Sequence, residues 1–299
     1  MHVFLTYMQK KTILFILTSV FAIRNGFSAE IDSVTPRNLA LDNSIDTINE
    51  TINQRIEEGI RKANTQQDYV EDTEDVADRK KDTVCDEKML YTELRKAIFQ
   101  SITPSWGLKG YDLDKQLRGL LVGQSYPLSL NDSIYRDIEY SEGVSLKLKG
   151  LSDVVSINGN LVGLDKIGHF FAQGWQYFEL TDHDKETLDS AIEWGRQKEA
   201  GLFGYTTTGI FSFADLVANL NGWRFWNKVL LKQGDPLSGA IANFFNSPYV
   251  GCEIQVVDSI RSIKIVRAWK FKARFDLADY IDGAWDEGNN CNNYADPMI

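Results

Sequence analysis

Three consecutive stretches with helical apolar spacing, over residues 164–180, 185–200 and 211–231, constrain the fold of this 299-residue chain most strongly. Their large apolar residues recur at intervals that place them on one face of a helix. Short segments containing glycine, threonine or aspartate separate the stretches, and such residues favour turns. The pattern predicts a mainly α domain whose successive helices pack against one another.

A smaller β component is expected on both sides of these helices. Val154–Ile157 and Leu161–Gly163 flank Asn158-Gly159-Asn160, and Asn-Gly between two apolar runs is a strong hairpin signal. β-like runs also cover residues 249–257 and 263–275, followed by an expected last helix at 277–287. The predicted fold class is therefore mainly α (α+β minor), a helical domain with a β-hairpin and a small C-terminal β element.

The N-terminus has the pattern of an export signal. Lys10 and Lys11 precede the uncharged run Thr12–Ile23, which is too short to span a bilayer and is followed by small residues. We expect residues 1–28 to be a signal peptide cleaved after Ser28, and the mature protein to be periplasmic or secreted, with no transmembrane span left. Retention of the segment as an N-terminal anchor is the alternative.

Residues 29–64 are expected to form an amphipathic helix, because apolar residues recur every three or four positions from Leu41 to Lys62. The isoleucine seam could dock on the main domain, pair with a second copy or recruit a protein partner, and docking is favoured because the heptad pattern is short. Residues 65–84 are rich in aspartate and glutamate and predict an acidic linker. The main helical domain is then 85–299.

Overall composition excludes two classes of protein. A charged fraction of 25% is ordinary for a soluble globular domain and excludes a polytopic membrane protein. The formal net charge of −10 argues against a nucleic-acid-binding protein, because phosphate binding needs clustered lysine and arginine.

The cysteines of an exported chain predict at most one intramolecular disulfide, because there are three of them. Cys252 and Cys291 are the favoured pair, since both lie in the C-terminal third. Cys85 could replace either. Their scattered positions show no zinc-binding spacing.

Polar side chains interrupt two of the apolar helices at helical spacing. Asp165, His169 and Gln173 lie four residues apart on one helix, and Asp215 and Asn219 repeat this spacing on another. Buried ionisable groups need partners. If the two helices pack together, these side chains are expected to meet in one enclosed patch.

Two neighbouring segments could contribute to the same patch. Glu199 precedes a glycine-containing turn, and Thr207 and Thr208 supply hydroxyls before the helix that carries Asp215. The threonines are candidate ligand-binding residues, together with Lys166, Gln173 and Asn219. Backbone N–H groups at a helix start also favour an anion.

The motif Asp165-Lys166-Ile167-Gly168-His169-Phe170-Phe171, then Glu199, then the run 211–222 resembles the D-K-x-x-H-F, E, D-x-x-A-N-x-x-G pattern of VanZ-like proteins. It is also similar to YfiM-type bacterial envelope proteins of unknown function. The resemblance covers about residues 163–226. VanZ-like proteins are integral to the membrane, whereas this chain has no span after its signal. The resemblance implies a shared helical site, without a settled reaction, made of Asp165, Lys166, His169, Glu199, Asp215 and Asn219.

Two hypotheses for function follow. Asp165, His169, Glu199 and Asp215 could bind zinc, manganese or iron, or His169 could act as a general base, in hydrolysis of an envelope lipid or glycan. Alternatively, the protein is a non-catalytic periplasmic binding or scaffolding protein in which the same residues are structural, for example with a buried Asp215–Lys166 pair. No nucleophile elbow, P-loop or H-E-x-x-H motif is present.

Overall fold

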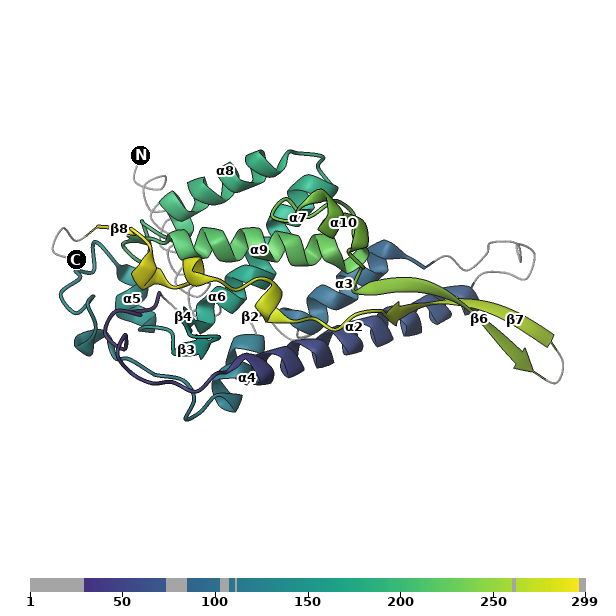
Figure 1. Ribbon diagram of the computed structural model, residues 1–299, viewed down its shortest axis with the longest axis horizontal. Coiled ribbons are helices and arrows are strands. Elements are labelled where there is room, and N and C mark those ends of the chain that lie inside the picture. The colour runs from purple at the N-terminus through teal and green to yellow at the C-terminus, as the bar shows by residue number, and fades with distance from the viewer. Residues whose placement is uncertain (1–29, 74–84, 103–107, 111, 260–261, 296–299) are drawn as a thin grey trace, which may run out of the picture.

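A computed structural model describes residues 30–73, 85–102, 108–110, 112–259 and 262–295. The predicted signal peptide lies outside the described residues. Helix α9 (Phe213–Leu230) runs through the middle of the molecule (Figure 1), and the chain packs around it. The mainly α prediction is confirmed, since the β structure of the described residues consists of two-stranded antiparallel sheets.

One nearly continuous helical rod packs along α9. It consists of α6 (Leu164–Gly168), a π-helical segment (His169–Gln173) and α7 (Gly174–Asp182). Helix α8 (Leu188–Lys198) follows, and Glu199–Phe203 continues it through a kink at Gly201, whose φ and ψ of −117° are not helical. Figure 1 shows α8 above α9. The three predicted helices are therefore present, and the first contains a π-helical turn that apolar spacing cannot indicate.

Helix α2 (Ile45–Thr73) is long and docked on the main domain, next to α3 (Glu87–Ile98) and strand β7. Its isoleucine seam is buried in the same core as α9, at Ile45, Ile48, Ile52, Ile56 and Ile60. Close packing against α3 depends on Gly59, where a Cβ would lie 2.9 Å from the Leu94 Cα. The docked arrangement is thus the one observed.

Both predicted bounds of this helix are wrong. The helix begins at Ile45 and not at residue 29, and residues 65–73 continue α2 instead of beginning a linker. Before the helix, the Asp32 carboxylate accepts the Val34 and Thr35 N–H groups, a local turn that competes with helix formation. Adding residues to a helix that the isoleucine seam has already ordered needs no new nucleus, so the helix can extend past residue 64. The rest of the predicted linker, 74–84, lies outside the described residues.

The predicted hairpin is present, and the two C-terminal β-like runs also pair with each other. Strands β3 (Val154–Ile157) and β4 (Asn160–Gly163) pair around Asn158 and Gly159, whose φ angles of 50° and 84° suit a tight turn with positive φ at both positions. Strands β6 (Val250–Ser259) and β7 (Ser262–Phe271) form a long hairpin that extends beside α2 (Figure 1).

Short elements complete the described chain: β1 (Gln100–Ile102) pairs with β2 (Leu108–Gly110), and β5 (Ile210–Phe211) pairs with β8 (Asn293–Tyr294). The remaining α-helices are α4 (Asp112–Leu120), α5 (Val144–Lys149) and α10 (Ala240–Phe245). Residues 277–287 do not form the predicted helix. They form 3-10 turns at 277–279, 283–285 and 287–289, each preceded by an aspartate that accepts a backbone N–H. Such Asp-capped turns compete with helix formation.

The disulfide links Cys85 to Cys252, so the predicted Cys252–Cys291 pair is wrong. The bond joins Cys85, two residues before α3, to strand β6, and Cys291 is free and exposed. The hairpin β6–β7 lies beside α2, which packs on α3, and this neighbourhood places Cys252 near Cys85. The closeness of Cys252 and Cys291 in the sequence therefore indicated the wrong pair.

Among the described residues, none of the helices is both long and apolar enough to cross a bilayer. Trp223, Phe225 and Trp226 of α9 belong to the core. Trp223 and Trp226 are buried, and their indole N–H groups donate to Thr181 Oγ1 (2.8 Å) and the Phe171 carbonyl (2.9 Å). Both side chains therefore join α9 to the rod α6–α7 through apolar packing and a satisfied donor.

Candidate functional site

A fully buried lysine lies at the centre of the candidate site. The ammonium of Lys166 is 2.8 Å from Asp165 Oδ2, 2.5 Å from Asp215 Oδ1 and 2.5 Å from Glu287 Oε1. Glu30 Oε2 is 3.4 Å away. Burial would lower the pKa of Lys166, but the four carboxylates together raise it well above its ordinary value. Lys166 is therefore a buried cation that neutralises part of an acidic cluster.

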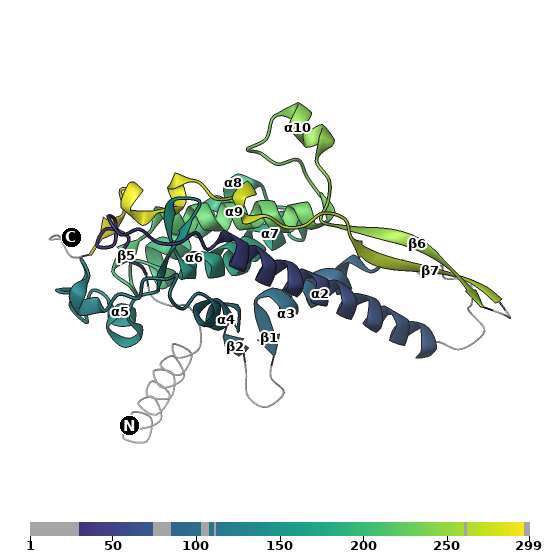
Figure 2. The same ribbon diagram turned by 60° about the horizontal axis from the view of Figure 1, so that its bottom comes forward.

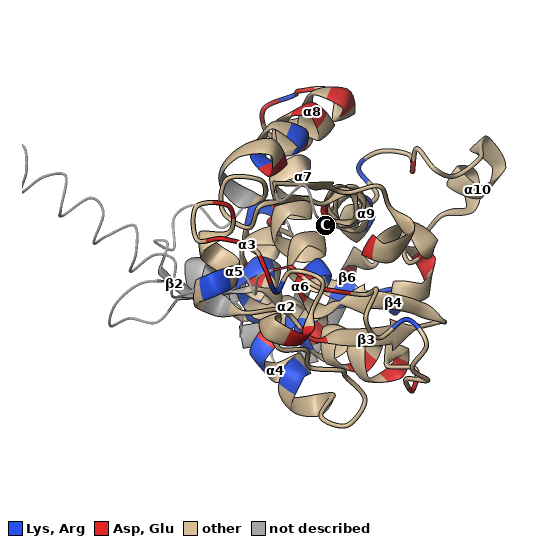
Figure 3. Cartoon of the chain, turned by 90° about the vertical axis from the view of Figure 1, so that its left-hand side faces the viewer, with Lys and Arg blue, Asp and Glu red and all other residues tan. Residues whose placement is uncertain are grey.

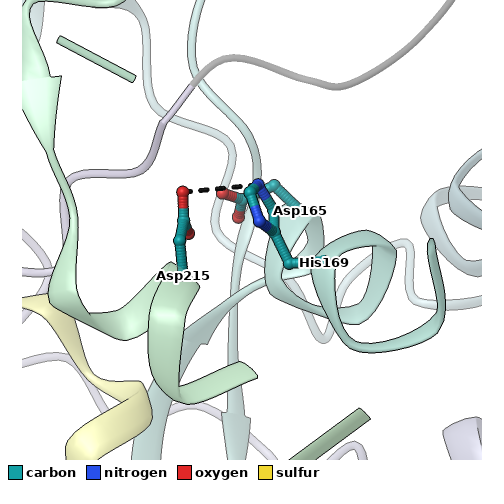
Figure 4. Close-up of side chains that lie close together, drawn as sticks. All are labelled: Asp165, His169 and Asp215. Atoms are coloured by element: carbon teal, nitrogen blue, oxygen red, sulfur yellow. Dashed lines mark ion pairs between the residues drawn. The ribbon is translucent and has the colours of Figure 1, made fainter. Parts of the chain in front are cut away.

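His169 lies beside this lysine and shares Asp215 with it. His169 Nε2 is 3.3 Å from Asp215 Oδ2 (Figure 4). His169 Nδ1 is 3.3 Å from Asn219 Oδ1. The two oxygens of Asp215 thus face two different partners, the ammonium and the imidazole. The side chain of His169 is 10% exposed, against 2% for Asp215 and 0% for Lys166. Among these three side chains, His169 is the one nearest to solvent.

Irregular helical backbone presents two candidate site residues. His169 is the first residue of the π-helical segment, and Glu199 precedes the kink at Gly201. π-Helical turns are rare and occur often at functional sites, where the wider turn re-aims a side chain. In this wider turn, Gln173 does not lie directly below His169, although it is four residues further along the chain. Gln173 is buried, but its Oε1 has no hydrogen-bond partner among the described residues.

Two glycines let the helices that carry the site approach to backbone contact. A Cβ at Gly222 of α9 would lie 1.8 Å from the Phe170 carbonyl oxygen, and a Cβ at Gly174 would lie 2.4 Å from Gly222 Cα. This contact fixes the distance between the π-helical segment and α9. It is the physical reason why Asp215 and Asn219 reach His169.

A second group of polar residues surrounds the cluster. The Ser212 N–H donates to Glu199 Oε1 (3.0 Å), and the Ser212 hydroxyl donates to Glu287 Oε1 (3.0 Å). The Thr208 hydroxyl contacts Glu30 Oε1 at 3.3 Å. The predicted threonine–acid neighbourhood therefore exists for Thr208. Thr207 instead donates its hydroxyl to the Gly204 carbonyl within its own turn.

Protons are held tightly by the acids of this group. Burial, reinforced by Asp215, raises the pKa of Glu30 and of Glu199 well above the ordinary value. Burial raises the pKa of Glu287 to about 7, against the lowering effect of Lys166. The cluster has more carboxyl groups than cations, and the excess negative charge must be neutralised by protons or by a further cation.

Three of the predicted ligands form a set suited to a cation. Asp165, His169 and Asp215 each offer one atom, and these atoms lie within 4.8 Å of one another. Lys166 contacts one oxygen of each aspartate, and Asp165 Oδ1 is buried without a hydrogen-bond partner among the described residues. The absence of a side chain at Gly163 makes room for Asp165 Oδ1, because a Cβ at residue 163 would lie 2.2 Å from that oxygen.

Glu199 does not join this set, contrary to the predicted four-residue ligand group, because its carboxylate is turned to the Ser212 N–H. A second acidic group consists of Glu30, Asp165, Asp215 and Glu287, and it surrounds Lys166. Glu30, Ser212 and Glu287 were missed by the sequence reasoning. Glu30 and Glu287 lie in short polar segments without helical spacing, and only the fold brings them to the helices. Ser212 precedes α9 directly as its N-cap and accepts the Asp215 N–H, a signal that the sequence does contain.

The comparisons with known proteins are negative throughout: the chain matches no family model, no curated protein sequence and no solved structure.

Proposed function

We propose that this protein is an exported bacterial envelope protein that binds one divalent cation through Asp165, His169 and Asp215. The observation that carries the proposal is the separation of 3.3 Å between His169 Nε2 and Asp215 Oδ2. A charge-assisted hydrogen bond is usually shorter, about 2.7–2.9 Å. Two ligands of one tetrahedral zinc ion, each about 2.1 Å from the metal, are about 3.4 Å apart.

The donor types agree with this proposal. One imidazole and two carboxylates suit zinc, manganese or iron rather than calcium or magnesium. When bound, such an ion supplies a Lewis acid that can activate water for hydrolysis. His169 is the most exposed member of the set, so a substrate would approach from its side. An envelope lipid or glycan is the substrate class that we propose, consistent with export and with the VanZ-like motif.

Export is supported by two features. The N-terminal pattern of residues 1–28 is that of a signal peptide, and the Cys85–Cys252 disulfide suits an oxidising compartment. We expect the intact mass of the exported protein to correspond to a chain beginning at Ala29. A chain that retains Thr12–Ile23 after export would indicate an N-terminal anchor.

Elemental analysis of the protein purified without chelator tests the metal-binding proposal. We expect close to one equivalent of zinc, manganese or iron in the wild type and in His183→Gln, a control at an exposed histidine. His169→Gln should lose the metal. Absence of stoichiometric metal from the wild type would contradict the proposal.

A non-catalytic binding or scaffolding role is the second candidate, and Lys166 favours it. A lysine with no exposed surface among four carboxylates can hold helices together without any substrate. In that case His169→Gln should lower the melting temperature by several degrees. A metal-binding role predicts little change in the melting temperature of the metal-free protein.

A further inference from the structure

An uncharged segment between α9 and β6 projects from the body of the molecule. Residues 236–252 contain no charged side chain, and their middle part forms α10. Figure 2 shows α10 standing away from the helices on a loop. Its large apolar side chains are exposed to an unusual degree: Leu237 63%, Ile241 77%, Phe244 82% and Phe245 76%. Such a patch needs an explanation, because soluble surfaces rarely gather large apolar side chains.

Side-chain hydrogen bonds and one ion pair fix the conformation of this loop. Asn243 Oδ1 accepts the Asp235 N–H (2.7 Å), and Asn243 Nδ2 donates to the carbonyls of Asp235 (2.9 Å) and Ser238 (3.2 Å). The Asp235 carboxylate binds Arg224 of α9 at 2.7–3.0 Å. The loop is thus closed by its polar side chains, while the rings of Phe244 and Phe245 pack on each other, 5.1 Å apart.

The base of the loop carries balanced charge. Arg224, Lys228 and Lys232 are spaced by four residues, and they pair with Asp235, Asp279 and Glu87. Three cations therefore meet three anions next to an uncharged tip. Figure 3 shows the α10 projection as uncharged beyond its base. A partner that complements this surface offers an apolar interior to the tip and a surface without net charge to the base of the loop.

We propose that the tip formed by Leu237, Ile241, Phe244 and Phe245 inserts into the interface of a zwitterionic phospholipid bilayer. A projecting apolar tip fits a deformable bilayer, whereas most protein partners would have to provide a groove. Aromatic side chains are well suited to the level between headgroups and acyl chains. The neutral base of the loop predicts binding without anionic lipid and with little dependence on salt. The proposal stands independently of the cation site.

A tryptophan placed at the tip reports insertion directly. The variant Phe244→Trp is bound to vesicles of brominated phosphatidylcholine. The emission of the wild type under the same conditions is subtracted, which removes the contribution of the native tryptophans. The matched control is Val122→Trp, at a position 78% exposed in the turn after α4. We expect the added emission of F244W to be quenched at least about two-fold more strongly than that of V122W. The quenching reports the surroundings of residue 244 itself, so it can be interpreted whether or not the Thr12–Ile23 segment is present.

A second variant measures the energetic contribution of the tip. Phe244→Ser with Phe245→Ser should lower the partition of the exported protein onto phosphatidylcholine vesicles by about ten-fold or more. Raising the salt from about 0.05 to about 0.5 M should change wild-type partition by less than about two-fold. Equal partition of the double variant and the wild type would overturn the proposal. The proposal would also be overturned if brominated lipid left F244W unquenched and the wild type formed a dimer that the double variant did not form. The tip would then bind a second copy of the chain.

Discussion

At the scale of single residues, the most consequential one is Lys166. Its ammonium is fully buried and lies within ion-pair distance of four carboxylates. Removing one partner from a buried charge cluster leaves uncompensated charge, which costs far more than an exposed pair is worth. The site therefore depends on Lys166 for its stability, whatever else it binds.

Lys166→Met should destabilise the fold by about 3–5 kcal/mol. Urea unfolding at pH 7.5 measures this loss, with Lys115→Met on an exposed position of α4 as the control, for which we expect a change within about 0.5 kcal/mol. A loss of stability no larger than that of the control would show that the carboxylates do not rely on the lysine.

Glu287 predicts a specific dependence of stability on pH. Burial raises the pKa of Glu287 from its ordinary value of 4.5 to about 7, so the folded state holds the proton more tightly. Its stabilising contribution is complete below about pH 4.5 and is lost as the pH rises through about 7. Glu287→Gln mimics the protonated form.

The stability of Glu287→Gln relative to the wild type should therefore increase between pH 4.5 and pH 8, by an amount on the order of 3 kcal/mol. Melting temperatures measured across this range give the comparison, and Glu139→Gln at an exposed position controls for the general loss of one acid. A difference independent of pH would mean that Glu287 is already ionised in the folded state.

At the scale of elements, the contact between α9 and the π-helical segment His169–Gln173 positions the site. Helical spacing predicted both helices and the meeting of Asp165, His169, Asp215 and Asn219. It could not predict the π-helical turn, because apolar spacing does not distinguish it from an α-helical turn over five residues. It also missed Glu30 and Glu287, which arrive from loops that carry no periodic signal.

Gly222→Ala tests this contact, because the added methyl would collide with the Phe170 carbonyl. We expect a destabilisation of about 1–3 kcal/mol and weaker cation binding, since α9 must move away from His169. Gly119→Ala on α4 is the matched control. A Cβ there meets nothing within 4 Å, and the substitution should stabilise by about 0.5–1 kcal/mol. Equal effects of the two substitutions would exclude close packing at Gly222.

At the scale of the whole molecule, segments far apart in sequence are tied to one core. The isoleucine seam of α2 packs in the same core as α9, and the Cys85–Cys252 bond joins the start of α3 to the long β6–β7 hairpin. The sequence predicted the docked helix correctly, but not the disulfide. Pairing of cysteines depends on the three-dimensional neighbourhood of α3 and β6, which local patterns do not contain.

Cys85→Ser should destabilise the protein by about 2–5 kcal/mol, while Cys291→Ser should leave stability unchanged. Peptide mapping without reduction checks the connectivity first. It should give one linked pair, 85 with 252, and alkylation of Cys291 in the folded protein. A linked 252–291 peptide would contradict the observed arrangement of the C-terminal segment.

The central claim is that Asp165, His169 and Asp215 bind one divalent cation. Calorimetric titration of chelator-treated protein with zinc tests it most directly, with manganese as the second ion. We expect one site per chain in the wild type and in His183→Gln, and no measurable binding in His169→Gln. Binding of zinc that is unchanged in His169→Gln, or absent from the wild type, would contradict it.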